Sequence, residues 1–174
     1  RSFRLHTNYK QHENPYADFI TTLYSPSDLL WSGEHDGSGE YAIKNGKCTF
    51  ATARELVEHG KPQHPFIGNS VYKNNSTNRK ASNVLQQKYI VLEWDGLTPT
   101  LPHDKQSIDL NLKRSWMMFY YVSDMLRLNH VATIYSGNKS YHYWCERPSE
   151  DKITWLRHCA NDLRFPDSVS GLDT

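Results

Sequence analysis

The chain has 174 residues, of which 37% are apolar and 13% aromatic, enough to build one domain with a real hydrophobic core. Its 20 basic residues balance 19 acidic ones, which excludes a protein that coats nucleic acid by bulk charge, so any anion site has to be a local arrangement. The three cysteines form no CxxC pair, which argues against a disulfide framework or a zinc module and favours a reducing, cytoplasmic setting, and no window is apolar enough to span a membrane.

The first third of the chain is mixed in character. Residues 34–50 read as short strands around Asp-Gly and Asn-Gly turns. Residues 52–60 predict a short helix, because Thr52 and Glu55 have the spacing of a capping box and Gly60 is suited to a helix stop.

A polar stretch follows at residues 68–82, with three basic residues, Lys73, Arg79 and Lys80. A solvated loop is the plain interpretation, and a loop that contacts phosphates is the alternative. Lys88, a little further on, is a fourth candidate for such a contact.

The remainder alternates between clear strands and helices. Residues 88–95 predict a strand, and residues 107–129 predict a long amphipathic helix. The helix has an apolar stripe at three-and-four spacing, which consists of Ile108, Leu112, Trp116, Phe119, Val122 and Leu126. Residues 130–135 and 140–145 read as a β-hairpin, and residues 149–164 as a second helix. This order predicts an α+β fold, in which helices pack on a sheet.

The strand at 88–95 carries two carboxylates near its end. Alternate side chains of a strand share a face, so Glu93 and Asp95 point the same way, roughly 6.5–7 Å apart. Two anions at that spacing repel each other, and a divalent cation such as Mg²⁺ or Mn²⁺ relieves the repulsion. The alternative is a strand end with one salt-bridged acid and one turn-forming Asp-Gly pair. The other face is wholly apolar and has to be buried; it consists of Ile90, Leu92 and Trp94.

The turn of the hairpin is richer in donor groups than chain reversal requires. Ser136 and Ser140 offer hydroxyls, Lys139 offers a mobile positive charge, and His142 lies on the same strand face as Ser140. Together with the backbone amides around Gly137, these groups suit a phosphorylated ligand. An ordinary turn followed by a structural histidine is the alternative.

In combination, these stretches resemble the archaeo-eukaryotic primase superfamily, above all the primase-polymerase domains of phage, plasmid and mobile-element replication proteins. The stretch "VLEWD" is similar to the family's apolar-apolar-acid-x-acid motif, and Ser140-Tyr141-His142 is similar to its S-x-H motif. Asp167 stands where the family has a third acid, with Asp173 as the competing position. The resemblance covers about residues 65–174, and it departs from the commoner pattern in having Glu as the first acid.

The resemblance implies a DNA primase or primase-polymerase that adds nucleotides by two-metal catalysis. Glu93, Asp95 and Asp167 would hold two Mg²⁺ or Mn²⁺ ions. The residues that would grip the nucleoside triphosphate are Ser136, Lys139, Ser140 and His142. A single-stranded DNA template would contact Lys73, Arg79 and Lys80, with exposed aromatic rings stacking on its bases.

The family also implies an architecture and a setting. We expect a primase-like, RRM-like catalytic sheet with packed helices over residues 66–174, and a small mixed α/β N-terminal part over residues 1–65. The chain would be a fragment of a longer replication protein, working where a phage, plasmid or mobile element replicates, with a helicase as a possible partner. The alternative functions are a non-catalytic module that binds single-stranded DNA or an origin, and a metal-dependent nuclease.

Overall fold

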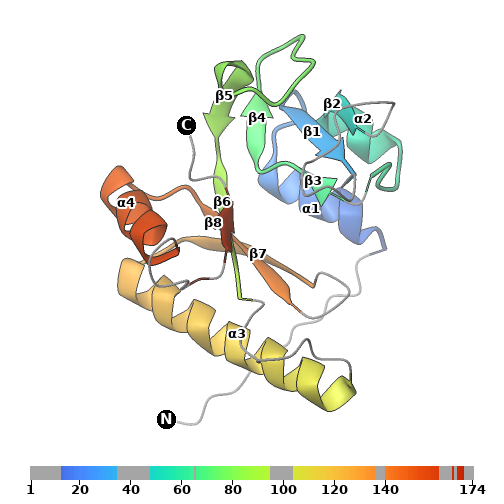
Figure 1. The fold of residues 1–174 in the computed structure, drawn as a ribbon. Coiled ribbons are helices and arrows are strands. Elements are labelled where there is room, and N and C mark those ends of the chain that lie inside the picture. Colours follow the sequence, from blue (N-terminus) through green and yellow to red (C-terminus); the bar gives the residue numbers. More distant parts are fainter. Residues whose placement is uncertain are drawn as a thin grey trace.

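The chain folds around two antiparallel sheets that occupy successive halves of the sequence (Figure 1). The structure, a computed structural model, describes residues 13–34, 48–64, 66–94, 104–135, 140–160, 166 and 168–170. The expected α+β class is confirmed by its antiparallel strands and packed helices. None of the helices in these described ranges is both long enough and apolar enough to cross a membrane.

The first sheet has five strands and is built from the first half of the chain, with the order β2-β1-β4-β5 and β3 paired beside β1. Its strands are β1 (Leu29–Gly33), β2 (Cys48–Thr52), β3 (Phe66–Ile67), β4 (Ser70–Tyr72) and β5 (Val84–Gln87). A 3-10 turn, η1 (Ala81–Asn83), precedes β5.

Two short helices accompany this sheet, α1 (Pro15–Leu23) and α2 (Ala53–Glu58). The capping box predicted for α2 is present: the Thr52 hydroxyl accepts from the Glu55 amide, and the Glu55 carboxylate accepts from the Thr52 amide at 2.7 Å. Gly60 adopts a φ of +77°, which lets the chain leave the helix at little steric cost. Local sequence signals therefore fix this helix at both ends.

The second sheet has the order β7-β8-β6-β9, and all of its pairings are antiparallel. Its strands are β6 (Tyr89–Glu93), β7 (His130–Tyr135), β8 (Tyr141–Glu146) and β9 (Ser168–Ser170). The predicted strand at 88–95 and the predicted hairpin are thus both found, and β6 lies at the interior of the sheet between β8 and β9.

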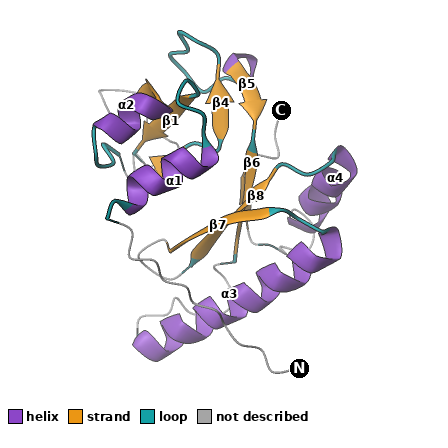
Figure 2. Cartoon of the chain, turned by 180° about the vertical axis from the view of Figure 1, so that it is seen from behind, coloured by secondary structure: helices purple, strands orange, loops and turns teal. Residues whose placement is uncertain are grey.

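Two helices pack on one face of the second sheet, α3 (Lys105–Leu126) and α4 (Glu150–His158) (Figures 1 and 2). The apolar face predicted for β6 is completely buried beneath them. The cluster that forms this core includes Ile90, Leu92, Trp94, Phe119, Val122, Tyr143, Ile153 and Leu156. Burial of apolar side chains is the dominant favourable contribution to folding.

The stripe predicted for α3 is right at its centre and wrong at one position. Phe119 and Val122 are buried as expected, whereas Trp116 is partly exposed and Asn111 and Ser115 are fully buried instead. The Ser115 hydroxyl is accommodated because it lies 2.8 Å from the Tyr143 hydroxyl, which satisfies both groups inside the core.

The other face of the second sheet packs against the N-terminal unit, which consists of the first sheet with α1 and α2. Tyr89 of β6 and Trp144 of β8 belong to a second core with residues of α1 and β1. Tyr24 packs edge-on against Tyr89, and Phe19 edge-on against Trp144. Lys88, between the two sheets, pairs with Asp28 at 2.8 Å. The two units thus share a core.

The expectation of a polar loop over residues 68–82 is partly wrong. The segment includes β4, in which Val71 and Tyr72 are buried. The strand forms because Val71 joins the core shared with α1 and β1 and the Tyr72 ring packs edge-on against Phe50, a tertiary effect that the polar composition around them conceals. The expected N-terminal part, residues 1–65, ends just before β3, which pairs with β1; the division of the chain into parts stays a prediction.

Candidate functional site

The end of β6 brings together segments that are far apart in the sequence. Glu93, the last residue of β6, lies directly opposite His142 of β8 on one side and Ser168 of β9 on the other. Directly opposed residues of an antiparallel pair project from the same face, with Cβ atoms about 4.5–5.5 Å apart. The register therefore places Glu93, the first acid of the stretch "VLEWD", beside His142, the histidine of Ser140-Tyr141-His142.

Glu93 is the centre of a small polar cluster. Its Oε1 atom accepts a hydrogen bond from the Ser140 hydroxyl at 2.6 Å and lies 3.1 Å from His142 Nε2. Ser140 is almost completely buried, at 1% exposure, while the Glu93 and His142 side chains are 23% and 32% exposed. The serine therefore supports the carboxylate from inside, and the imidazole borders it on the open side.

The site lies on the face of the sheet that the sequence predicted. Tyr89 and Val91 share this face with Glu93, and both contribute to the core beneath the N-terminal unit. The face thus changes along one strand from apolar to charged. Because the apolar end is packed against α1 and β1, the carboxylate is held at a fixed position on a rigid scaffold.

Several predicted site residues lie outside the described residues: Asp95, Asp167, Ser136, Lys139 and the competing Asp173. Asp167 directly precedes β9, whose first residue pairs with Glu93. The roles of these five residues stay predictions.

The donors present at the site suit a divalent cation in kind. A carboxylate oxygen and an imidazole nitrogen on neighbouring strands are ligands that Mn²⁺ accepts, and carboxylates also suit Mg²⁺. In the described parts of the chain, no group of three or more His, Cys, Asp or Glu side chains could hold a metal ion. A complete set would need the carboxylates of Asp95 and Asp167.

The residues predicted to contact the template do not lie near Glu93. Lys73, Arg79 and Lys80 belong to the segment between β4 and β5, which lies beyond the start of β6, whereas Glu93 is at the other end of that strand (Figure 1). Lys73 Nζ donates to the Ser82 carbonyl at 2.6 Å, and the Arg79 guanidinium stacks 4.4 Å above the Trp31 ring. Lys88 is engaged with Asp28. These contacts give three of the four cations a structural role.

A cleft beside the cluster was not predicted. It has a volume of about 450 Å³ and lies between β7 of the second sheet and α1, β1 and β3 of the N-terminal unit. Ile134, one of its lining residues, is directly opposite His142, so the cleft adjoins the polar cluster on the same face. Its other lining residues include Tyr16, His64 and Phe66. The alternation of side chains along β7 could have placed Ile134 on the same face as the cluster. No local sequence pattern predicts the lining residues that come from the N-terminal unit.

Comparison with known proteins does not assign this chain to a family. No family profile, no curated protein and no solved structure matches the chain.

Proposed function

We propose that this protein is a nucleotidyltransferase of the primase-polymerase type, which adds nucleotides opposite a single-stranded DNA template. The observation that carries the proposal is the contact of Glu93 with both Ser140 and His142. These three residues come from the two motifs on which the family resemblance depends. Their meeting on adjacent strands gives the resemblance a spatial basis that similarity of motifs alone lacks.

The polar cluster suits phosphoryl chemistry because it combines a fixed anion with a hydrogen-bond donor. Ser140 is too deeply buried to act as a general phosphate contact, and its hydroxyl orients the Glu93 carboxylate instead. His142, which is more exposed and faces Glu93 through Nε2, would donate to a phosphate oxygen through its other ring nitrogen. This division of labour refines the role expected for Ser140, which was contact with the triphosphate.

Divalent cations, when bound, would supply the positive charge that activates a 3′-hydroxyl and stabilises a leaving pyrophosphate. The chain's own contribution is to hold Glu93 at the end of β6, and by the motif Asp95 and Asp167 would supply the other carboxylates. Nucleoside triphosphate and template would enter from the adjoining cleft, whose mixed aromatic and polar lining suits a nucleotide.

The proposal is tested by incorporation of labelled nucleotide on primed and unprimed single-stranded DNA, in Mg²⁺ and in Mn²⁺. Glu93→Gln keeps the side chain's size and removes its charge, and we expect it to lower incorporation by about 10²–10³-fold. Glu146→Gln is the matched control, because Glu146 is the exposed last residue of β8, at the other end of the same sheet, opposite Tyr89. That variant should retain the wild-type rate.

Three outcomes would contradict the proposal. Full incorporation by Glu93→Gln would remove the carboxylate from the chemistry. Cleavage of DNA that needs metal but no nucleoside triphosphate, and that Glu93→Gln abolishes, would show a nuclease instead. Binding of single-stranded DNA without either reaction would show a non-catalytic replication module.

A further inference from the structure

The outward face of α3 carries an apolar stripe on the molecular surface. Met117 is 68% exposed and Tyr121 is 61% exposed, and the stripe extends to Leu110, Tyr120 and Met125, which are also exposed. Spacings of three, four and seven residues place these side chains on one side of the helix. A group of large apolar side chains exposed on one face is typical of a surface that binds a partner.

Charged residues border this stripe in a regular order. Asp109 and Lys113 lie toward the start of α3, and Asp124 and Arg127 lie at its end; all four are exposed. The spacings of Asp109, Lys113 and Asp124 are compatible with one flank of the helix, and Arg127 directly follows its last residue with a left-handed φ of +49°. Along the chain, the order is therefore negative, positive, apolar, negative, positive.

This order is complementary to itself only when a second copy runs in the opposite direction. In an antiparallel pair, Lys113 faces Asp124 of the second copy, and Asp109 faces Arg127 of the second copy. The register in which Met117 lies opposite Tyr120 places Lys113 directly opposite Asp124, and it brings Asp109 to within one residue of Arg127. In a parallel pair, equivalent residues of the two copies would lie side by side, and like charges would face each other.

We propose that the outward face of α3 is the interface of a symmetric, antiparallel homodimer. A two-fold axis near the middle of the helix would make each contact twice, as in other isologous dimers. The apolar centre would supply the attraction, and the four charge pairs at its edges would set the direction and register.

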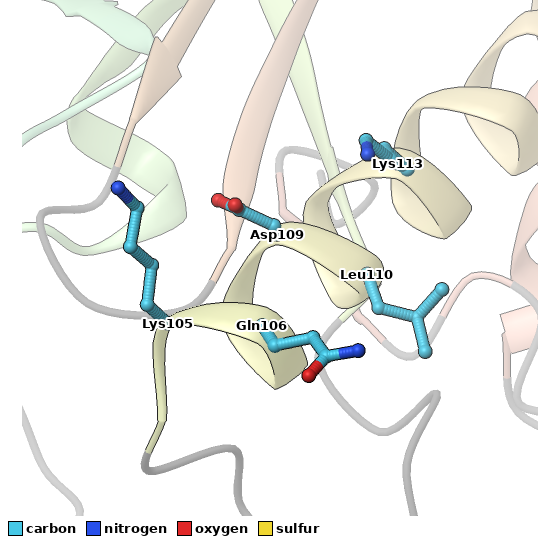
Figure 3. Close-up of a pocket in the computed structure, with 5 residues that line it drawn as sticks. All are labelled: Lys105, Gln106, Asp109, Leu110 and Lys113. Atoms are coloured by element: carbon cyan, nitrogen blue, oxygen red, sulfur yellow. The ribbon is translucent and has the colours of Figure 1, made fainter.

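The surface shape agrees with this register. A shallow hollow of about 440 Å³ lies on the first half of α3, and its lining includes Asp109, Leu110 and Lys113 (Figure 3). In the antiparallel pair, the last turn of the second copy's α3, with Arg127, lies over this hollow. The positive side chain would thus meet Asp109 in a recess rather than on a flat surface.

The interface is separate from the candidate active site. The inner side of α3 packs against the second sheet through Phe119 and Val122, while the Glu93 cluster lies on the opposite face of that sheet. A dimer through α3 would therefore leave the cleft beside the Glu93 cluster open in each copy. The proposal does not depend on the proposed function.

The contact is small, because one helix of 22 residues, roughly 33 Å long, contributes most of it. Interfaces of this size belong to the weak or transient class, so we expect a dissociation constant in roughly the micromolar range. Single-stranded nucleic acid is a poorer occupant, because the two negative and two positive side chains on this flank cancel and offer phosphates no net attraction.

Sedimentation equilibrium over a concentration series tests the proposal, with two charge reversals made singly and then mixed. Lys113→Glu alone and Asp124→Lys alone each create like-charge pairs, and each should raise the dissociation constant about tenfold or more. An equimolar mixture of the two variants restores opposite charges at both positions. It should form heterodimers with nearly the wild-type affinity.

Lys61→Glu is the matched control, because Lys61 is exposed in the N-terminal unit and makes the same change of charge. It should leave the association unchanged, and thermal unfolding checks that all variants are folded. A wild-type chain that stays monomeric up to about 100 times the expected dissociation constant would overturn the proposal. So would a dimer that ignores the single reversals, or a mixture that fails to associate.

Discussion

The two faces of the second sheet are made by the same strands and have opposite tasks. On the face toward α3 and α4, Ile90 and Leu92 of β6 are fully buried in an apolar core, and so is Trp94, which directly follows the strand. On the other face, β6 begins under the N-terminal unit with Tyr89 and ends with the Glu93 carboxylate. One face holds the sheet together, and the other presents a charge from it.

The comparison shows how a small domain keeps a carboxylate in a fixed position. Burying a charged group costs free energy unless hydrogen bonds compensate for it. Glu93 has that compensation from Ser140 and His142, whereas the apolar face needs none. The buried apolar residues on both faces thus allow the end of one face to carry a charged group that contributes little to stability.

The largest expected effect is a loss of stability when a side chain is removed from the core of the helix-covered face. Leu92→Ala removes a fully buried side chain from the core beneath α3 and α4, and we expect it to lower the free energy of unfolding by about 2–5 kcal/mol. Val91→Ala, one residue earlier on the opposite, half-buried side of the strand, should cost clearly less. Urea denaturation of both variants measures the difference, and equal losses would show that the two faces contribute alike.

A pair of buried serines sharpens the comparison. Ser140 supports Glu93 on one side of the sheet, while Ser115 bonds to the Tyr143 hydroxyl on the other. Ser140→Ala leaves the carboxylate with one donor fewer, and we expect nucleotide incorporation to fall about 10–100-fold. Ser115→Ala should cost about 1–3 kcal/mol of stability, from the loss of its own bond, and spare the activity.

Incorporation assays and denaturation curves on both serine variants check this prediction. If Ser115→Ala impaired incorporation as strongly as Ser140→Ala at temperatures where both are folded, the functional distinction between the faces would be wrong. Ser140→Thr, which retains a hydroxyl, should recover part of the activity if orientation of Glu93 is the cause.

The smallest expected effect is a pH dependence on the helix-covered side. Partial burial against Phe119 and Trp116 lowers the pKa of His130, so the folded protein resists its protonation. Below the ordinary pKa near 6.5, the unfolded chain takes up the proton first, and stability is lost as the pH falls toward the lowered value.

His130→Gln removes that difference, so the melting temperature of the variant should fall less between pH 7 and pH 5 than that of the wild-type protein. Solvent screening keeps the effect small, about 1–3 °C. Thermal unfolding at the two pH values measures it. An equal fall in both proteins would assign the pH dependence to other groups.

Much of the local structure was determined by the sequence. The alternation in "YIVLEW" identified the strand and the face it buries, because every second side chain of a strand points the same way. The Thr52–Glu55 capping box and Gly60 identified the ends of α2, because those signals act within a few residues. The hairpin of β7 and β8 was equally local.

Other features were decided by tertiary structure. The contact of buried Ser115 with the Tyr143 hydroxyl depends on packing between α3 and β8, whereas its bond to the Leu112 carbonyl lies within its own helix. The contact of Ser140 with Glu93 and the cleft beside Ile134 depend on strand order and on packing between the two units. Such features come from chain segments far apart in sequence, and the free energy of their contacts, rather than any local preference, selects them.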